Sequence, residues 1–151
     1  MTDFATGQGA KLVQSPVKEL LDGKKNFAFE TTASGTNYIK YLEEAKKQGY
    51  EIHLTFLWLA SAEQAIQRVA QRVKQGGHHI PEETIYRRYY SGIRNLFKWY
   101  LPIADSANIM DNSSEESLGR IIARKCKNGL IEIQDEGIWA KMGEAASERR
   151  I

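Results

Sequence analysis

The sequence lacks features that would tie it to an extracellular or membrane setting. Cys126 is the single cysteine among 151 residues, so no internal disulfide can form. One thiol fits a reducing, cytoplasmic compartment. The longest apolar stretch, residues 52–60, is too short to cross a bilayer. Residues 1–10 do not show the basic-then-apolar pattern of a signal peptide.

Net charge is also small, but the basic residues are unevenly distributed. Lys and Arg number 21 against 19 Asp and Glu, which leaves +2 and says little about partners. Between residues 68 and 98, however, only Glu82 and Glu83 oppose a basic set made of Arg68, Arg72, Lys74, Arg87, Arg88, Arg94 and Lys98. Such a segment indicates an anion site, and the alternative is two solvated helix faces.

Length and composition are those of one globular domain spanning residues 1–151, with 42% hydrophobic and 26% charged residues. Hydrophobic spacing predicts helices over residues 11–22, 36–48, 61–75 and 81–99. Strands are predicted over residues 26–30, 51–59 and 108–111, and the apolar run 51–59 suits a strand buried on both faces. The resulting β-α-β-α-α-β order predicts a parallel sheet with crossover helices.

Short local signals set the ends of these elements. Ser61 with Gln64 forms a capping box, Gly76-Gly77 ends that helix, and Pro81 begins the next one. Asn128-Gly129 between residues 121–127 and 130–134 predicts a β-hairpin. A helix over residues 137–146 follows. The expected fold is therefore α/β, a parallel sheet flanked by helices with a C-terminal β-hairpin and helix.

Glu30 is the first candidate functional residue. It ends a short apolar strand and enters the loop Thr31–Gly35, which is made of small and hydroxyl residues. Ligands of open α/β sheets bind beyond the carboxyl ends of strands. A carboxylate there can take a proton from a hydroxyl or hold a sugar hydroxyl. The alternative, an exposed acid bonded to its own loop, stays open from the residues alone.

Arg88 is the second candidate. It flanks an apolar helical stripe that is made of Ile85, Tyr89, Ile93, Leu96 and Tyr100. A guanidinium at such a margin needs a partner, and its planar fork suits phosphate. Arg68 and Arg72 lie opposite their own helix's apolar stripe, where charges usually face solvent.

Other sequence patterns do not predict a functional site. The run Gly7–Lys11 lacks the spacing of a phosphate loop and has Leu12 where Ser or Thr is needed. His78 and His79, with His53 elsewhere, do not form a metal-ligand set, so no metal site is expected. Aromatic residues interleave with the basic ones over residues 86–100, which is more typical of a core than of base stacking.

Several motifs together resemble those of one family. They are Phe27–Gly35 (FAFETTASG), Leu57–Leu59, Arg68–Val73, Gly76–His78, Ile80-Pro81, Arg87–Tyr89 and Asp111–Ser113. Their order and spacing resemble the zeta-toxin-like P-loop kinases over roughly residues 10–140. The resemblance implies a P-loop kinase fold and ATP- and Mg²⁺-dependent phosphoryl transfer. In the best-known members the acceptor is a hydroxyl of UDP-N-acetylglucosamine, and the toxin is paired with an antitoxin.

The resemblance also implies roles for individual residues. Glu30 and Thr31 match a stretch beside the substrate, and Arg72 and Arg88 match catalytic arginines that reach the ATP phosphates. A lid is implied for Gly76, Gly77 and His78. Nucleotide contact is implied for a third stretch, Asp111, Asn112 and Ser113.

One departure from the family is large. The family's N-terminal strand and its phosphate loop, G-x-x-x-x-G-K-[ST], are not found in these 151 residues, so an incomplete and inactive kinase domain is expected. The first alternative is a non-catalytic module that pairs through an exposed sheet edge with an antitoxin or a second copy. A nucleic-acid binder is the least favoured reading, because the total charge is near neutral.

Overall fold

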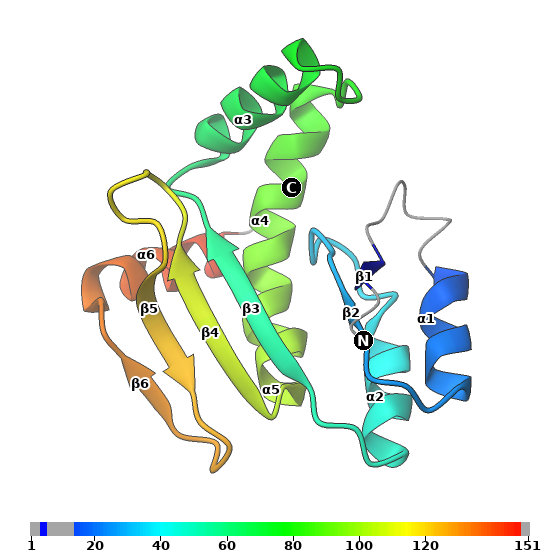
Figure 1. Ribbon diagram of the computed structural model, residues 1–151. Coiled ribbons are helices and arrows are strands. Elements are labelled where there is room, and N and C mark those ends of the chain that lie inside the picture. The colour runs from blue at the N-terminus through cyan, green and yellow to red at the C-terminus, as the bar shows by residue number, and fades with distance from the viewer. Residues whose placement is uncertain (1–3, 6–13, 149–151) are drawn as a thin grey trace.

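The computed structural model describes residues 4–5 and 14–148, and it has an α/β architecture (Figure 1). Strands β1 (Phe4–Ala5) and β2 (Ala28–Phe29) form a two-stranded parallel sheet. The larger sheet has the order β3-β4-β5-β6, with bounds His53–Trp58, Ser106–Asp111, Arg120–Lys125 and Ile131–Ile133. Strands β3 and β4 are parallel, β5 pairs antiparallel with β4, and β6 pairs antiparallel with β5, as the predicted hairpin requires of these last two strands.

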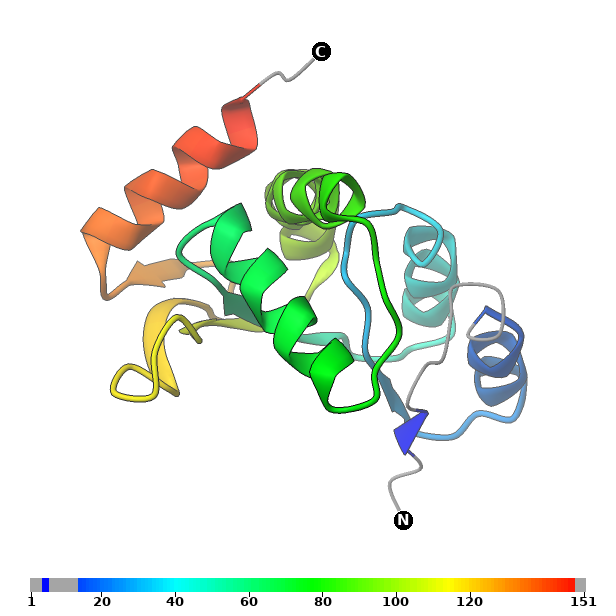
Figure 2. The same cartoon turned by 90° about the horizontal axis from the view of Figure 1, so that it is seen from above.

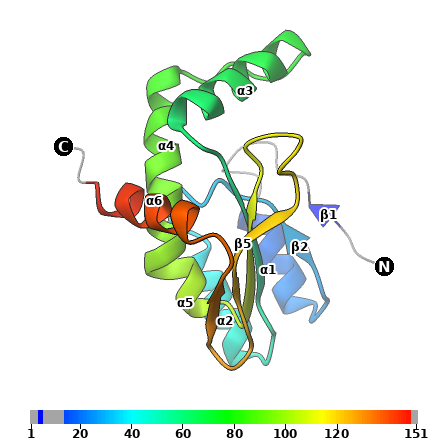
Figure 3. The same ribbon diagram turned by 90° about the vertical axis from the view of Figure 1, so that its left-hand side faces the viewer.

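The helices agree with the predicted ones apart from a few residues at their ends. They are α1 (Gln14–Asp22), α2 (Ile39–Lys47), α3 (Ala62–Lys74), α4 (Glu82–Asn95), the π-helix η1 (Leu96–Tyr100), α5 (Leu101–Ile103) and α6 (Glu136–Ser147). Figure 3 shows α4, α5 and α6 along one side of the larger sheet. Gly7–Lys11 and residues 11–13 of the first expected helix lie outside the described residues. Within the described part, no helix is long and apolar enough to span a bilayer.

The main core lies between the larger sheet and the helices on that side. Ile93 and Leu96 contribute from the α4–η1 helix, Ile109 and Ile122 from the sheet, and Met142 from α6, and each is at most 2% exposed. Full burial of one such side chain stabilises the fold by about 1.5–3 kcal/mol. This packing fixes α4 against the sheet, which matters below because α4 carries Arg88.

Two sequence predictions about the strands were wrong. Strand β3 is not buried on both faces: Leu54, Phe56 and Trp58 pack toward the helices, whereas the alternate side chains His53, Thr55 and Leu57 are exposed. No described element covers that second face, and Leu57 is 54% exposed. Strand β2 joins β1 rather than the sheet of β3, so β3 is hydrogen-bonded only to β4 among the described strands.

Predicted helix ends are mostly confirmed. The Ser61 side chain accepts from the Gln64 N–H at 3.0 Å, and Gln64 Oε1 accepts in return from the Ala60 N–H at 2.9 Å. In a capping box the Gln64 side chain would accept from the Ser61 N–H, so the observed bond to the Ala60 N–H is shifted by one residue. Helix continues past residue 99 through Pro102, because η1 and α5 extend α4 without a break.

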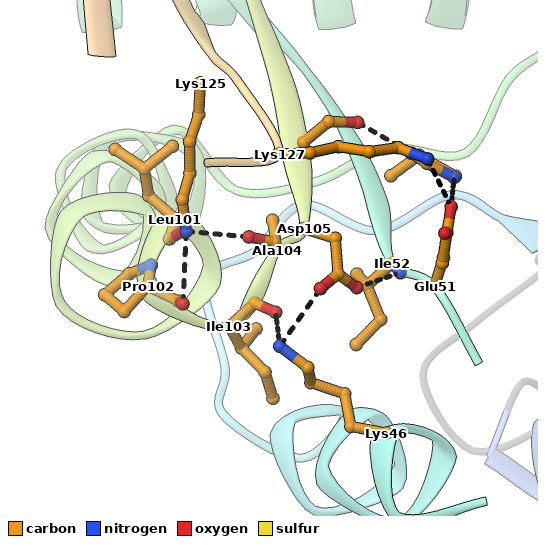
Figure 4. A network of polar contacts seen from close by, with 12 residues as sticks. Lys46, Glu51, Ile52, Leu101, Pro102, Ile103, Ala104, Asp105, Lys125 and Lys127 are labelled. Atoms are coloured by element: carbon orange, nitrogen blue, oxygen red, sulfur yellow. Dashed lines mark hydrogen bonds and ion pairs between the residues drawn. The ribbon is translucent and has the colours of Figure 1, made fainter. Parts of the chain in front are cut away.

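Charged groups at the amino ends of β3 and β4 have structural partners (Figure 4). Lys125 Nζ donates to the carbonyls of Leu101 and Ala104 at 2.7 Å each, which caps the end of α5. Asp105 accepts from the Ile52 N–H at 2.7 Å and pairs with Lys46 at 3.4 Å. The Ile52 hydrogen bond lowers the pKa of Asp105. These interactions tie α2 and α5 to the sheet, so the charged side chains of Lys46, Asp105 and Lys125 already have structural partners.

Candidate functional site

Three stretches that follow parallel strands lie at one end of the molecule. Strands β2, β3 and β4 all run toward the upper end in Figure 1, so the residues that follow them share that end. They are the loop 31–35 after β2, residues 59–61 after β3, and the loop 112–119 after β4. This is where an open α/β sheet is expected to hold a ligand.

The segment Asp111–Ser113 closes the carboxyl end of β4. The Asn112 N–H donates to the Trp58 carbonyl at 2.9 Å, and the Ser113 carbonyl accepts from the side-chain amide of Gln64 at the start of α3. Asp111 is 5% exposed and accepts from the Ser113 N–H at 2.8 Å. Burial alone would raise the pKa of Asp111, but hydrogen bonds from Ser113 and Ser117 and the charge of Arg120 bring it below its usual value. The carboxylate therefore stays ionised and organises this loop.

Helices α3 and α4 form a hairpin that extends beyond the strand ends (Figures 1 and 2). We call residues 62–95 the helical arm. At its tip, Gly76 adopts a φ of +98°, and the Gly76 and Gly77 N–H groups bond to the carbonyls of Val73 and Arg72 at 3.1 and 2.8 Å. This is a Schellman turn. A Cβ on Gly77 would come within 2.9 Å of the Arg72 carbonyl, so both glycines are needed for the tip.

Tyr89 anchors the arm to the strand ends. Its hydroxyl donates to the Leu59 carbonyl at 2.8 Å, just after β3. Burial, and to a lesser extent Glu63, raises the pKa of Tyr89 to about 12, so the hydroxyl remains a donor at neutral pH. The sequence placed Tyr89 on an apolar stripe but gave no sign of this bond.

Arg88 and Arg72 occupy different parts of the helical arm. Arg88 is half-buried, and its guanidinium makes no hydrogen bond or ion pair with any described residue. Arg72 is exposed in the last turn of α3, near the tip with Gly76, Gly77 and His78. A half-buried cation that has no partner among the described residues is the arrangement that the sequence associated with an anion, and Arg88 fits it better than Arg72.

The loop 31–35 is held against the C-terminal half of α4. Asn95 Nδ2 donates to the Ala33 carbonyl at 2.8 Å, and Gly92 packs against the Thr32 carbonyl. Arg88 precedes Asn95 by seven residues, which places both on nearly the same line of the helix, about 10.5 Å apart along its axis. Helix α4 thus aligns Arg88 with the loop that begins after Glu30. Asn95 was missed in the sequence, where only its spacing from Arg88 could have drawn attention to it.

Glu30 and Thr31 lie at the exposed start of this loop. Thr31 Oγ1 accepts from the Ala33 N–H at 3.2 Å, whereas Glu30 makes no hydrogen bond or ion pair with any described residue. The expected alternative, in which Glu30 bonds to its own loop, is therefore not what the described residues show. No group of three or more His, Cys, Asp or Glu side chains among them is placed to hold a metal ion.

Comparison with known proteins gives the family. A model of the zeta toxin family matches residues 3–118, which is most of the chain. An uncharacterized protein of Haemophilus influenzae is 36% identical over 63 residues, a stretch that spans 42% of this chain and 45% of that protein. No solved structure matches. The mixed sheet and flanking helices are consistent with part of a P-loop kinase fold. The chain belongs to the zeta toxin family.

Proposed function

We propose that this chain supplies the acceptor loop and the phosphate-binding arginines of a zeta-toxin-type kinase. The observation that carries the proposal is the alignment on α4 of Arg88, which has no partner among the described residues, with the Asn95 that holds the loop after Glu30. One rigid helix then sets the spacing between a cation for phosphate and a carboxylate for a hydroxyl. Positioning and electrostatics of this kind make up most of the catalysis of phosphoryl transfer.

Each residue has a distinct role in this proposal. The Arg88 fork binds phosphate oxygens, and Arg72 adds a second cation from the tip of the helical arm. In this proposal the Glu30 carboxylate, which no described residue bonds to, accepts a hydrogen bond from the acceptor hydroxyl, and Thr31 follows it in the sequence. A sugar hydroxyl, as in UDP-N-acetylglucosamine, fits this pair. Asp111–Ser113 borders the nucleotide side.

The described residues fit the cofactors only in part. The arginines suit the phosphates of ATP, which supplies the phosphoryl group in the complete reaction. A ligand set for Mg²⁺ is not found among the described side chains, so no step is assigned through the metal. The 151 residues hold no G-x-x-x-x-G-K-[ST] motif, and we propose that this chain by itself does not turn over ATP.

The test is anion binding by the 151-residue chain. Calorimetric titration with ATP at low salt, without Mg²⁺, is compared for wild type, Arg88→Ala and Arg87→Ala. Arg87 is the matched control because it is adjacent, equally charged and exposed. We expect about tenfold weaker binding for Arg88→Ala, which is about 1.4 kcal/mol, and little change for Arg87→Ala. Equal loss in both variants, or no binding by wild type, contradicts the proposal.

The acceptor side is tested separately with UDP-N-acetylglucosamine. Binding should perturb the amide resonances of residues 30–34, and Glu30→Gln should weaken it because a neutral amide is a poorer acceptor than a carboxylate. ADP formation by the 151-residue chain above the level of a Glu30→Gln, Arg88→Ala double variant would overturn the proposed lack of turnover.

A second candidate function is a binding module that pairs through β3. It is favoured by the absence of a second described neighbour for β3 and by the exposed Leu57. Light scattering after size-exclusion chromatography distinguishes the two readings. A dimer that Leu57→Lys dissociates supports pairing at β3, and a monomer at all concentrations counts against a second copy there.

A further inference from the structure

The loop 31–35 has a conformation that its own sequence does not favour. Ala33 adopts a φ of +56°, in the left-handed region that residues with a Cβ rarely occupy. Its side chain is nevertheless buried, in a cluster with Ile39 and Tyr100. Within the loop, support comes from the Thr31 hydroxyl on the Ala33 N–H and from an exposed contact between the Thr32 and Ser34 hydroxyls. A backbone of this kind persists only where surrounding structure holds it.

The surrounding structure that holds the loop 31–35 is one continuous helical segment, α4 with η1. Asn95 Nδ2 donates to the Ala33 carbonyl at 2.8 Å, and the Tyr100 hydroxyl donates to the Gly35 carbonyl at 2.9 Å. One residue before Ala33, the Thr32 carbonyl lies so close to Gly92 that a Cβ on Gly92 would come within 2.9 Å of it. Three carbonyls of a five-residue loop are thus engaged from outside it.

The π-helix is what lets Asn95 and Tyr100 act together. In an α-helix, two residues five apart point about 140° away from each other. Residues 96–100 form a π-turn instead, and the Leu101 N–H bonds to the Leu96 carbonyl five residues back. A turn of i→i+5 bonds is wider than an α-helical turn, so it narrows the angle between residues i and i+5. Asn95 and Tyr100 can therefore reach the same loop.

Both donors are protected and suited to this role. Tyr100 is 3% exposed, and burial, with a smaller effect of Tyr38, raises the pKa of Tyr100 to about 12, so its hydroxyl remains protonated. Asn95 is half-buried. Each side chain ends at a carbonyl of the loop.

We infer that Asn95 and Tyr100 are positioning residues, which hold the loop 31–35 in its left-handed conformation and thereby aim Glu30 and Thr31 at the acceptor. They act through the carbonyls of Ala33 and Gly35 and do not touch the ligand. The inference that the loop is held rests on the hydrogen bonds alone, whereas the effect on acceptor binding rests on the proposed function.

The variants that test this inference remove single donors with little change of shape. Tyr100→Phe removes the hydroxyl bonded to Gly35, and Tyr50→Phe is its matched control, because the Tyr50 hydroxyl likewise donates to a carbonyl, that of Lys25, at 3.1 Å. Asn95→Asp removes the amide donor, and Asn108→Asp makes the same charge change at an exposed position of β4.

Two measurements follow on the 151-residue chain. The first is amide hydrogen exchange by NMR, where Tyr100→Phe and Asn95→Asp should each speed exchange at Ala33 and Ser34 about tenfold, with the amides of β3–β5 unchanged. The second is affinity for UDP-N-acetylglucosamine, which should fall about five- to tenfold in the same two variants and stay unchanged in the controls. Restoring an amide donor with Asn95→Gln should recover part of the affinity.

The outcomes separate the inference from the proposed function. Unchanged exchange in the loop overturns the inference, as does faster exchange with full affinity. If wild type does not bind the probe while the two variants loosen only the loop, the proposed function fails and the positioning role falls with it. In that case the hydrogen-bonded support of the loop still stands. Faster exchange throughout the chain would assign the two residues to global stability and would also overturn the inference.

Discussion

Two loops leave the carboxyl ends of parallel strands, and they are held in opposite ways. The loop 31–35 is fixed from outside, by Asn95 and Tyr100 more than 60 positions away in the sequence. The loop 112–119 has outside contacts with Trp58 and Gln64, but most of its side-chain bonds are local: Asp111 accepts from the Ser113 N–H, and Ser114 and Ser117 bond to each other at 2.8 Å. The first loop depends on the tertiary fold, and the second depends mainly on its own side chains.

The positions of the two loops therefore depend on different parts of the structure. A loop that is carried by α4 keeps a fixed distance from every other residue on that helix, and Arg88 is one of them. The loop 112–119 depends less on α4, and Gln64 joins it to the start of α3. Variants that remove one kind of support and spare the other therefore test the comparison directly.

The largest expected effect is at Tyr100. Tyr100→Ala removes a buried ring and the bond to Gly35, so the free energy of unfolding should fall by about 3–5 kcal/mol. Its neighbour Trp99 is 40% exposed, and Trp99→Ala should cost about 1 kcal/mol or less. Urea unfolding measures both. Similar losses for the two variants would show that the support of the loop 31–35 is not centred on Tyr100.

Gly92 should show the next largest effect. Gly92→Ala places a Cβ 2.9 Å from the Thr32 carbonyl, so either the loop or the helix must move, at a cost of about 1–3 kcal/mol. The control is Gly143→Ala in α6, where a Cβ meets nothing within 4 Å. That variant should instead stabilise by about 0.5–1 kcal/mol, since alanine loses less backbone entropy than glycine. Thermal unfolding should move in opposite directions for the two, and a shared sign would contradict the close approach.

The contribution of the loop 112–119 to stability should depend on pH. The folded pKa of Asp111 lies below its usual value, so its stabilisation is complete above about pH 4 and is lost as the pH falls through the folded pKa. Asp111→Asn should therefore lower the free energy of unfolding by about 1–2 kcal/mol at pH 7, and the difference from wild type should shrink as the pH falls through the folded pKa of Asp111. Asp22→Asn, at an exposed end of α1, is the control and should change little. A difference that does not depend on pH would exclude the carboxylate as the cause.

Local signals predicted most of the fold and only part of the site. Ser61, Gly76 and the Asn128-Gly129 turn act within a few residues, so helix ends and the hairpin could be predicted from spacing alone. Whether β3 is covered on its second face depends on which other elements pack there. The apolar run His53–Trp58 carries no such information, and that prediction was wrong.

For the candidate site, residue types indicated candidate groups but not what holds them in place. Arg88 was singled out because a cation beside an apolar stripe needs a partner, and the structure leaves it unpartnered among the described residues. Asn95 and Tyr100 act through backbone carbonyls in another part of the chain, and a π-turn brings them together. The period of an α-helix places these two residues apart, so helical spacing could not have predicted their shared role.

The smallest expected effects compare the hydroxyl pairs of the two loops. Thr32→Val removes the exposed contact with Ser34, and the loop 31–35 should stay in place because α4 holds it, with a change within about 0.5 kcal/mol. Ser117→Ala leaves the Ser114 N–H without the hydroxyl that accepts it at 3.2 Å, and should cost about 1 kcal/mol. Amide exchange should then rise at Ser114 in the second variant and stay unchanged at Ala33 and Ser34 in the first. Faster exchange at Ala33 in Thr32→Val would mean that the loop supports itself, and the contrast between the two loops would fail.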